Sequence, residues 1–252
     1  MNKIVFITGA TSGFGKAAAE KFAAHQYDLI ITGRREPLLL ALQKELENKY
    51  GVAVLPLVFD VRDREAVAGA ISNMPDRWIQ VDVLLNNAGL ALGRDYINEG
   101  NIDDWDTMLD TNVKGLLYVS KAVLPLMTAR NQGHIINLGS VAAKDIYEKG
   151  NVYCASKAAV DAISRGMRVD LLKHHIKVTA IHPGAAETEF SLVRFKGDGD
   201  TAKKIYDGFK PLSAEDVADV IYYCASLPPH VCVNDLVITC TAQADGIYIF
   251  KE

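Results

Sequence analysis

The fold is decided by a stretch near the start of the chain, Ile4-Val5-Phe6-Ile7-Thr8-Gly9-Ala10-Thr11-Ser12-Gly13-Phe14-Gly15. Its first four residues form an apolar run typical of a strand buried on both faces. Three glycines follow at positions 9, 13 and 15, and a helical pattern begins near Lys16. Glycines can simply permit a tight turn. Directly after a first strand, however, they let the backbone and the helix dipole approach a pyrophosphate, so residues 9–15 predict a dinucleotide-binding turn.

Strand and helix patterns alternate along the rest of the chain. Runs that predict strands lie at residues 4–7, 29–32, 52–59, 81–85, 134–138, 176–181 and 236–239. Helical patterns lie between them at residues 16–25, 37–49, 65–73, 103–110, 113–130, 151–174 and 214–226. This alternation predicts an α/β fold with a doubly wound parallel sheet, a Rossmann fold. Residues 184–212 have no pattern, and we expect them to form a substrate loop.

Length and composition indicate one domain with no nucleic-acid partner. The 252 residues are 49% apolar, so we expect residues 1–252 to form a single dinucleotide-binding and catalytic domain. The net charge of -4, with no block of like charges, argues against nucleic acid. No run resembles a signal peptide or a bilayer span, so we expect a soluble, cytoplasmic protein with no membrane partner. The four cysteines lack zinc-site spacing, which predicts reduced and mostly buried thiols.

The second predicted strand ends in Thr32-Gly33-Arg34-Arg35. A carboxylate at this point would bind the ribose hydroxyl of NAD. Two guanidinium groups stand there instead, and guanidinium pairs well with phosphate. The arginines could be ordinary surface charges, but cations near a helix N-terminus oppose the helix dipole. Arg34 and Arg35 therefore predict NADP as the cofactor.

Tyr153 and Lys157 are four residues apart in a helical pattern, so they project from one helix face. A nearby ammonium favours a phenolate and would lower the pKa of the tyrosine. The pair alone could equally be a helix-surface contact. Ser140, however, follows a predicted strand at the carboxyl edge of the sheet, where ligands of such folds bind. Its hydroxyl could orient a substrate carbonyl or alcohol there.

The glycine turn, Ser140, Tyr153 and Lys157 resemble the short-chain dehydrogenase/reductase family. The resemblance includes Asn86-Asn87-Ala88-Gly89, Asn112, and Pro183-Gly184 followed by Thr188. The resemblance runs from Thr8 to about Thr239. It implies that Tyr153 is the acid/base and that Lys157 lowers its pKa and holds the nicotinamide ribose. By the same resemblance, Ser140 positions the reacting oxygen, and Asn112, opening a long helix, anchors a water relay to Lys157.

The resemblance also implies further cofactor contacts and a quaternary structure. Asp60, followed by Val61, matches the position that meets the adenine, although it could be only a strand-end cap. Asn87, Ala88 and Gly89, and then Pro183, Gly184 and Thr188, are expected to line the cofactor. The helix of residues 151–174 pairs between subunits in this family, which implies a homodimer or homotetramer. Core packing alone could explain the apolar stripe of that helix.

Residues 87–93 and 188–198 look like the NADP-dependent 3-hydroxy acid dehydrogenase branch, which includes serine and allo-threonine dehydrogenases. That likeness implies small 3-hydroxy acids as substrates. The segment 184–188 is a residue shorter than this branch would have, and Glu187 adds negative charge. Our hypothesis is that Arg194 binds a substrate carboxylate. As the alternative, Arg194 and Lys196 are solvated charges of a lid or contacts between subunits.

Two other functions remain open. A 3-oxoacyl carrier-protein reductase or broad carbonyl reductase would use the same catalytic residues, with Arg165 and Arg168 docking an acidic carrier. A non-catalytic NADPH-sensing protein would keep the fold without turnover. We expect no metal site, because neither His182 nor the adjacent His174 and His175 has metal-site spacing. His182 could approach the cofactor or substrate, or serve as a hydrogen-bonded structural histidine.

Overall fold

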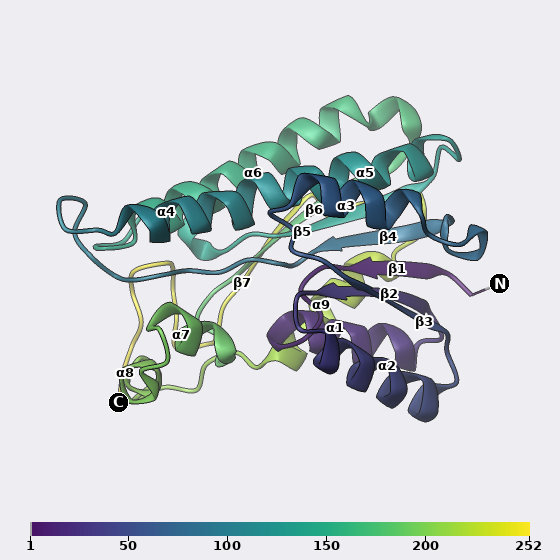
Figure 1. Ribbon diagram of the computed structural model, residues 1–252. Helices are drawn as coiled ribbons and strands as arrows, with labels where there is room; N and C mark the ends of the chain where they lie inside the picture. Colours follow the sequence, from purple (N-terminus) through teal and green to yellow (C-terminus); the bar gives the residue numbers. More distant parts are fainter. Residues whose placement is uncertain (1) are drawn as a thin grey trace.

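The computed structural model describes residues 2–252, apart from the side chains of residues 202 and 203, and contains a seven-stranded sheet (Figure 1). The strands are β1 (Ile4–Ile7), β2 (Asp28–Gly33), β3 (Val54–Val58), β4 (Val81–Asn86), β5 (Gly133–Leu138), β6 (Ile176–Pro183) and β7 (Asp235–Ile238). They are all parallel, in the order β3-β2-β1-β4-β5-β6-β7. The predicted doubly wound α/β fold is confirmed.

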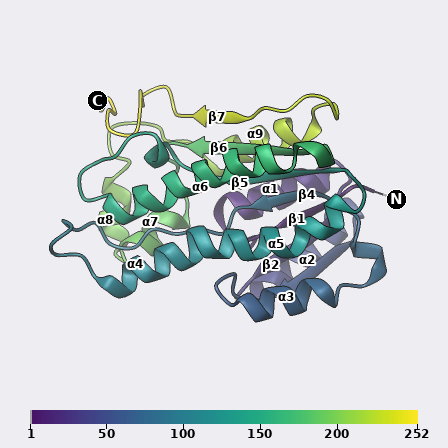
Figure 2. The ribbon, with the colours of Figure 1, turned by 90° about the horizontal axis from the view of Figure 1, so that it is seen from above.

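Helices cover both faces of the sheet, because successive strand side chains point to opposite faces and both sets are apolar. Val5 and Ile7 pack toward α1 (Gly13–Ala24), α2 (Glu36–Tyr50) and α9 (Ala214–Ser226). Ile4 and Phe6 pack toward α3 (Arg64–Ser72), α5 (Leu116–Thr128) and α6 (Asn151–Asp170), which share the other face in both ribbon views (Figures 1 and 2). Each face thus has its own hydrophobic core.

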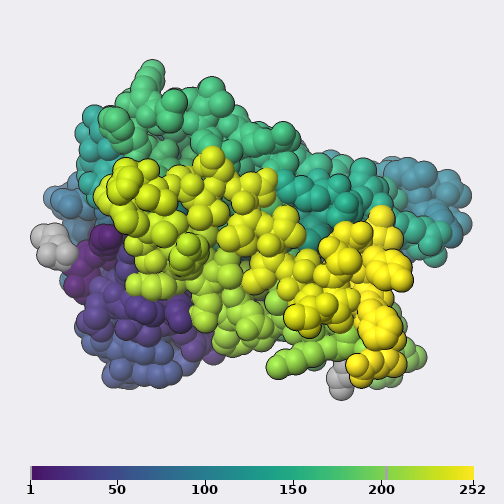
Figure 3. All heavy atoms as spheres, turned by 180° about the vertical axis from the view of Figure 1, so that it is seen from behind, coloured from purple at the N-terminus to yellow at the C-terminus, as the bar shows by residue number. Residues whose placement is uncertain are grey.

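The strand order reverses between β1 and β4, which is where folds of this type bind ligands. Three helices lie beyond the carboxyl ends of the strands, namely α4 (Ile102–Leu109), α7 (Glu189–Arg194) and α8 (Gly199–Lys204) (Figure 1). In the view from behind, the C-terminal segment, in yellow, spreads over the side of the molecule opposite to that seen in Figure 1 (Figure 3). Among residues 2–252, no helix combines the length and apolar character needed to cross a bilayer.

Some predicted helix boundaries differ in the structure, and the segment without a pattern is partly helical. Residues 184–212 contain α7 and α8, and α7 starts where the Thr188 side chain accepts a hydrogen bond from Phe190 N–H. A π-helical turn, Asp110–Gly115, joins α4 to α5 without a break, so Asn112 lies inside a continuous helix and does not open one. The helix predicted to reach His174 ends at Asp170, and a 3-10 turn follows. Strand β7 is half exposed because it forms the edge of the sheet.

Candidate functional site

The glycine turn between β1 and α1 is shaped for a close ligand. Gly9 and Gly13 adopt φ angles of +66° and +50°, which side chains rarely tolerate. A methyl group added at Gly9 would lie 3.0 Å from the Ala88 Cα atom. The first turn of α1 holds no acidic residue, and the Ser12 side chain makes no capping bond. The N–H groups that begin α1 are therefore not capped by a side chain, which suits an anion.

A cavity of about 330 Å³ runs from this turn along the carboxyl edge of the sheet. Most of the predicted cofactor residues line it: Gly9, Thr11, Ser12, Gly13, Phe14, Arg34, Arg35, Asp60, Val61, Asn87, Ala88, Gly89, Tyr153, Lys157 and Thr188. Other lining residues were not predicted, namely Thr32, Gly33, Phe59, Leu90, Thr111, Leu138, Gly139, Glu189, Phe190 and Val193. Most of these directly adjoin a predicted residue, so extending each motif by one position would have found them.

Four predicted cofactor residues do not line the cavity. Ala10 is fully buried in the core. Gly15 packs so closely against the Gly9 carbonyl that an added methyl group would collide with it. Pro183 ends β6 and is buried, and a methyl group at Gly184 would collide with the Gln243 side chain. The structure thus gives these residues packing contacts within the chain.

At one end of the cavity, two guanidinium groups are held only by weak, solvated contacts. Arg35 Nη2 donates to Thr11 Oγ1 at 2.8 Å, and Arg35 Nη1 lies 3.5 Å from a Glu189 oxygen. Arg34 Nη1 lies 3.7 Å from Asp60 Oδ2. Exposed ion pairs of this kind contribute little to stability. Both arginines are therefore available to an anionic ligand at this end.

Asp60 is held by a different arginine. Arg62 makes a two-pronged contact with its carboxylate, with Nη2 2.7 Å from Oδ2. Burial raises the pKa of the Asp60 carboxyl, but hydrogen bonds from Arg62 outweigh burial and hold the pKa below its ordinary range. Asp60 therefore stays ionised as an acceptor beside the cavity.

At the other end, Tyr153 and Lys157 are buried on one face of α6, as predicted. Lys157 Nζ donates to the Leu138 carbonyl at 2.9 Å and lies 6.0 Å from the Tyr153 ring centroid. Burial lowers the pKa of Lys157 to about 8. Burial also raises the pKa of Tyr153 above its ordinary value, which is opposite to the direction predicted from the sequence. The reason is that desolvation of the phenolate outweighs the attraction of the nearby cations.

The lowered pKa of Lys157 predicts a measurable stability profile. Between pH 8 and pH 10.5, the unfolded chain carries a proton on Lys157 that the folded chain lacks, so the free energy of unfolding rises with pH. From about pH 8 to about pH 9.5 the gain is roughly 2 kcal/mol. Urea denaturation of wild type and Lys157→Met at the two pH values would measure it. Equal pH dependence in both proteins would contradict the assigned shift.

Ser140 and Asn112 adjoin this pair but do not line the main cavity. Ser140 Oγ accepts a hydrogen bond from Ala142 N–H at 3.1 Å, and the Ser140 hydroxyl partly offsets the rise in the Tyr153 pKa. Asn112 Nδ2 donates to Ser156 Oγ at 3.0 Å, and both ends of its amide bind the Leu90 backbone at 2.8 Å. The observed role of Asn112 is to fix that backbone beside Tyr153 and Lys157.

Arg194 lies on the far side of Tyr153. Its guanidinium carbon is 5.5 Å from the Tyr153 ring centroid, and Nη1 donates to the Tyr147 hydroxyl at 3.0 Å. Nε donates to the Gly93 carbonyl at 3.3 Å, whereas the buried Nη2 has no hydrogen-bond partner within the described part of the chain. A hollow of about 10 Å³ is bordered by both Tyr153 and Arg194. Tyr147 was not predicted, because it lies in an irregular segment without periodicity.

Three other candidates lie elsewhere. Arg165 Nη2 pairs with Asp161 at 3.1 Å, and Arg168 donates to the carbonyls of Val178 and Asn234. Both guanidinium groups thus bind within the chain, which weakens the idea that they dock an acidic carrier. His182 does not line either cavity and lies behind Ser140, so the structural interpretation of this histidine is the better one.

Comparisons with known proteins agree with this geometry. The family described as short chain dehydrogenase matches residues 3–197. NADP-dependent 3-hydroxy acid dehydrogenase YdfG of Salmonella typhi is 47% identical over 232 residues, 92% of each chain. Sulfoacetaldehyde reductase 2 of Chromohalobacter salexigens is 48% identical over 245 residues, 97% of this chain and 96% of that one. A structure of the closed form of serine dehydrogenase complexed with NADP+ has a TM-score of 0.91 at 43% identity, with 96% of each chain covered. This chain therefore belongs to the short-chain dehydrogenase family.

Proposed function

We propose that this protein is an NADP-dependent oxidoreductase that transfers hydride between the nicotinamide and the carbinol or carbonyl carbon of a small 3-hydroxy acid. Serine, allo-threonine and 3-hydroxypropionate are the candidate substrates. The observation that carries the proposal is one cavity that connects Arg34 and Arg35 to Tyr153 and Lys157. Relatives whose names include NADP and 3-hydroxy acids support both the proposed cofactor and the proposed substrate class.

The residues along the cavity suit each part of NADP. The uncapped first turn of α1 and the left-handed glycines suit the pyrophosphate. Arg34 and Arg35 suit the 2′-phosphate. Asp60 and Val61 suit the adenine end, and Lys157 suits the nicotinamide ribose. Asn87 to Gly89 and Thr188 complete the walls. The bound cofactor supplies the carbon that gives or takes the hydride.

In this proposal Tyr153 handles the proton. Its raised pKa keeps the phenol protonated near neutral pH, which is the form that can donate to a carbonyl oxygen during reduction. Oxidation needs the phenolate, which forms when the phenol passes its proton toward the water relay, and the phenolate then takes the proton of the alcohol. Lys157 is an ammonium below about pH 8 and favours the phenolate once it forms. Ser140 holds the reacting oxygen through its hydroxyl, and Asn112 anchors a water relay toward Lys157.

Arg194 is the proposed anchor for the substrate carboxylate. Its unpaired Nη2 is buried, and Arg194 borders the hollow beside Tyr153, which at about 10 Å³ has to widen to admit a carboxylate. A buried donor without an acceptor costs about 1–3 kcal/mol, and a carboxylate would satisfy it through a charge-assisted bond. The Tyr147 hydroxyl, already bonded to Arg194, orients the guanidinium for this contact.

Arg194→Ala is expected to lower kcat/KM for 3-hydroxypropionate roughly 10- to 150-fold, the value of one lost hydrogen bond to a charged group. An uncharged analogue, 1,3-propanediol, should lose far less because it has no carboxylate to anchor. Arg64→Ala, at an exposed position of α3, serves as the matched control. If acid and diol lose turnover equally, Arg194 is not the anchor.

A second candidate substrate is a small aldehyde that bears a sulfonate, favoured by the relative named sulfoacetaldehyde reductase 2. A guanidinium can pair with sulfonate oxygens as it does with a carboxylate. NADPH oxidation with sulfoacetaldehyde, beside NADP reduction with the 3-hydroxy acids, decides between the two. Turnover only with carrier-linked 3-oxoacyl groups would favour the carrier-protein reductase. NADPH binding with no turnover across the panel would favour a sensor.

We further propose a homodimer or homotetramer, as the family resemblance implies. The outer face of α6 is consistent with pairing, since Ala155, Ala158 and Ala162 are exposed there. Light scattering of the purified protein measures the assembly.

A further inference from the structure

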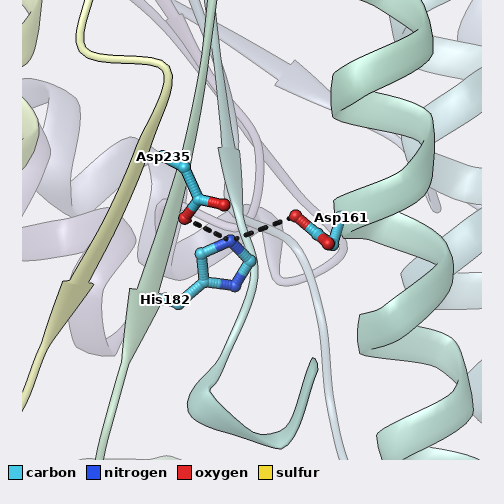
Figure 4. A group of neighbouring side chains, drawn as sticks. All are labelled: Asp161, His182 and Asp235. Atoms are coloured by element: carbon cyan, nitrogen blue, oxygen red, sulfur yellow. Dashed lines mark ion pairs between the residues drawn. The ribbon is translucent and has the colours of Figure 1, made fainter. Parts of the chain in front are cut away.

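Next to Ser140 lies a charged cluster that the proposed reaction does not use, with His182 and Asp161 buried and Asp235 exposed (Figure 4). His182, from β6, is fully buried, and its Nε2 is 3.3 Å from Asp235 Oδ1 and 3.6 Å from Asp161 Oδ1. Lys144 Nζ contacts the same two carboxylates, at 2.6 Å from Asp235 and 3.2 Å from Asp161. Arg165 also pairs with Asp161. His182, Asp161 and Asp235 could together ligate a metal ion, but the Lys144 ammonium and the Arg165 guanidinium already pair with the two carboxylates.

The other ring nitrogen of His182 faces the backbone of Ser140. Ser140 N–H points at Nδ1 from 3.4 Å, and the Ser140 carbonyl oxygen lies 3.2 Å from the same nitrogen. The imidazole packs against Gly139 so tightly that an added methyl group there would collide with Nδ1. The ring therefore fills the space directly behind the peptide that carries Ser140.

The charges around the ring decide its tautomer. Nε2 makes no well-aligned hydrogen bond within the described residues, but without a proton it would point a lone pair at two carboxylates 3.3 and 3.6 Å away, so we assign the proton to Nε2. Burial and the Lys144 ammonium lower the pKa of His182, although Asp235 and Asp161 oppose this. The imidazole is then neutral, and its unprotonated Nδ1 accepts from Ser140 N–H. A second proton would turn Nδ1 into a donor to the Ser140 carbonyl oxygen, 3.2 Å away, and the bond from Ser140 N–H would be lost.

We propose that His182 is a positioning residue for Ser140, held as the Nε2-protonated neutral imidazole by the Lys144–Asp161–Asp235 cluster. The inference rests on the proposed role of Ser140 in binding the reacting oxygen. Ser140 is extended, with φ -172° and ψ 157°, and its Oγ already accepts from Ala142 N–H. The hydroxyl proton, which lowers the pKa of Tyr153 where it points at the phenol oxygen, is then the donor for a substrate oxygen bound beside Tyr153. A ring that fixes the Ser140 peptide thereby fixes the direction of that donor.

Three substitutions at His182 distinguish the contribution of Nδ1 from that of Nε2. Asn places an amide oxygen near the position of Nδ1, Gln reaches the position of Nε2, and Leu provides neither. We expect His182→Asn to retain kcat within about threefold, and His182→Gln and His182→Leu to lose roughly tenfold or more, because small misplacements of a catalytic group are costly. NADPH affinity and the melting temperature report whether each variant folds. Equal kcat for all three folded variants overturns the proposal.

Wild-type protein provides a test that needs no mutation. The ¹⁵N chemical shifts of His182 should show a protonated Nε2 and an unprotonated Nδ1 at neutral pH. An Nδ1-protonated neutral ring would overturn the proposal, whatever the variants do.

Lys144→Met tests the electrostatic part. Without the ammonium, Asp161 and Asp235 raise the pKa of His182, and the protonated ring no longer accepts from Ser140. The kcat of this variant should fall as the pH falls through the new pKa, with the same ionisation visible in the His182 shifts. Lys144→Met combined with His182→Asn should not show this fall of kcat at low pH. Lys173→Met, at an exposed lysine, is the matched control. If kcat of the double variant still falls at low pH, the proposal is overturned.

Ser140→Ala separates failure of this inference from failure of the proposed function. If Ser140→Ala turns over like wild type, the proposed role of Ser140 is wrong. If Ser140→Ala is inactive while the His182 variants share one kcat, only the positioning role fails. A gain in activity or melting temperature on adding Zn²⁺ or Mg²⁺ to chelator-treated protein, lost in Asp161→Asn, would instead assign the cluster to a metal and overturn the proposal.

Discussion

Tyr153→Phe is expected to lower kcat roughly 10²- to 10⁴-fold, the usual contribution of a positioned acid/base, while NADPH binds almost as tightly as before. The phenol is buried and borders both the main cavity and the hollow beside Arg194, so it is the titratable group common to the two spaces. Phenylalanine keeps the ring and its contacts with Phe190 and Arg194 but removes the proton. Steady-state rates and fluorescence titration with NADPH measure the two quantities.

The matched control is Tyr223→Phe, which removes a phenol from an exposed position on α9. It should leave both turnover and cofactor binding unchanged. Retained turnover in Tyr153→Phe would rule out the acid/base assignment. A parallel loss of NADPH affinity would show that the hydroxyl serves mainly to bind the cofactor.

Replacing Arg34 and Arg35 together with alanine should weaken NADPH roughly 100-fold or more, since each removes a charge-assisted contact with the 2′-phosphate. NADH, which lacks that phosphate, should lose little affinity. The exposed guanidinium groups make only long, solvated ion pairs with Asp60 and Glu189, so their removal should cost little stability. Dissociation constants for both cofactors, at one fixed salt concentration, give the ratio.

Arg35 also donates to Thr11 in the glycine turn, so the two single variants should be measured as well. A distorted turn would weaken NADH and NADPH alike in Arg35→Ala but not in Arg34→Ala. Equal losses for both cofactors in every variant would argue against recognition of the 2′-phosphate.

The parts of the fold and site that depend on local pattern could be predicted from the sequence. The apolar runs placed all seven strands. The five inner strands are buried on both faces and so must be apolar throughout, whereas the edge strands β3 and β7 are only partly buried. The glycine turn and the four-residue spacing of Tyr153 and Lys157 likewise placed their residues at one cavity. Each of these signals lies within a few residues of the atoms it positions.

Features that depend on distant contacts could not be predicted. The pKa of Tyr153 follows from how completely other segments exclude water from it, which no spacing reveals. The contact of Arg194 with Tyr147 joins residues 47 positions apart. His182 looked like an isolated histidine, because its carboxylate neighbours come from α6 and β7.

The π-helical turn at Asp110–Gly115 sets the rotational register of the long helix that contains it. One residue turns an α-helix by about 100°, so deleting one residue here would leave a helix but rotate everything on one side of the deletion. Either Asn112 would leave Leu90 and Ser156, or the apolar face of α5 with Val119 and Val123 would leave the sheet. The extra residue of this turn lets one helix direct Asn112 at Leu90 and Ser156 and the apolar face of α5 at the sheet. The chain can therefore neither lose nor gain a residue at this point.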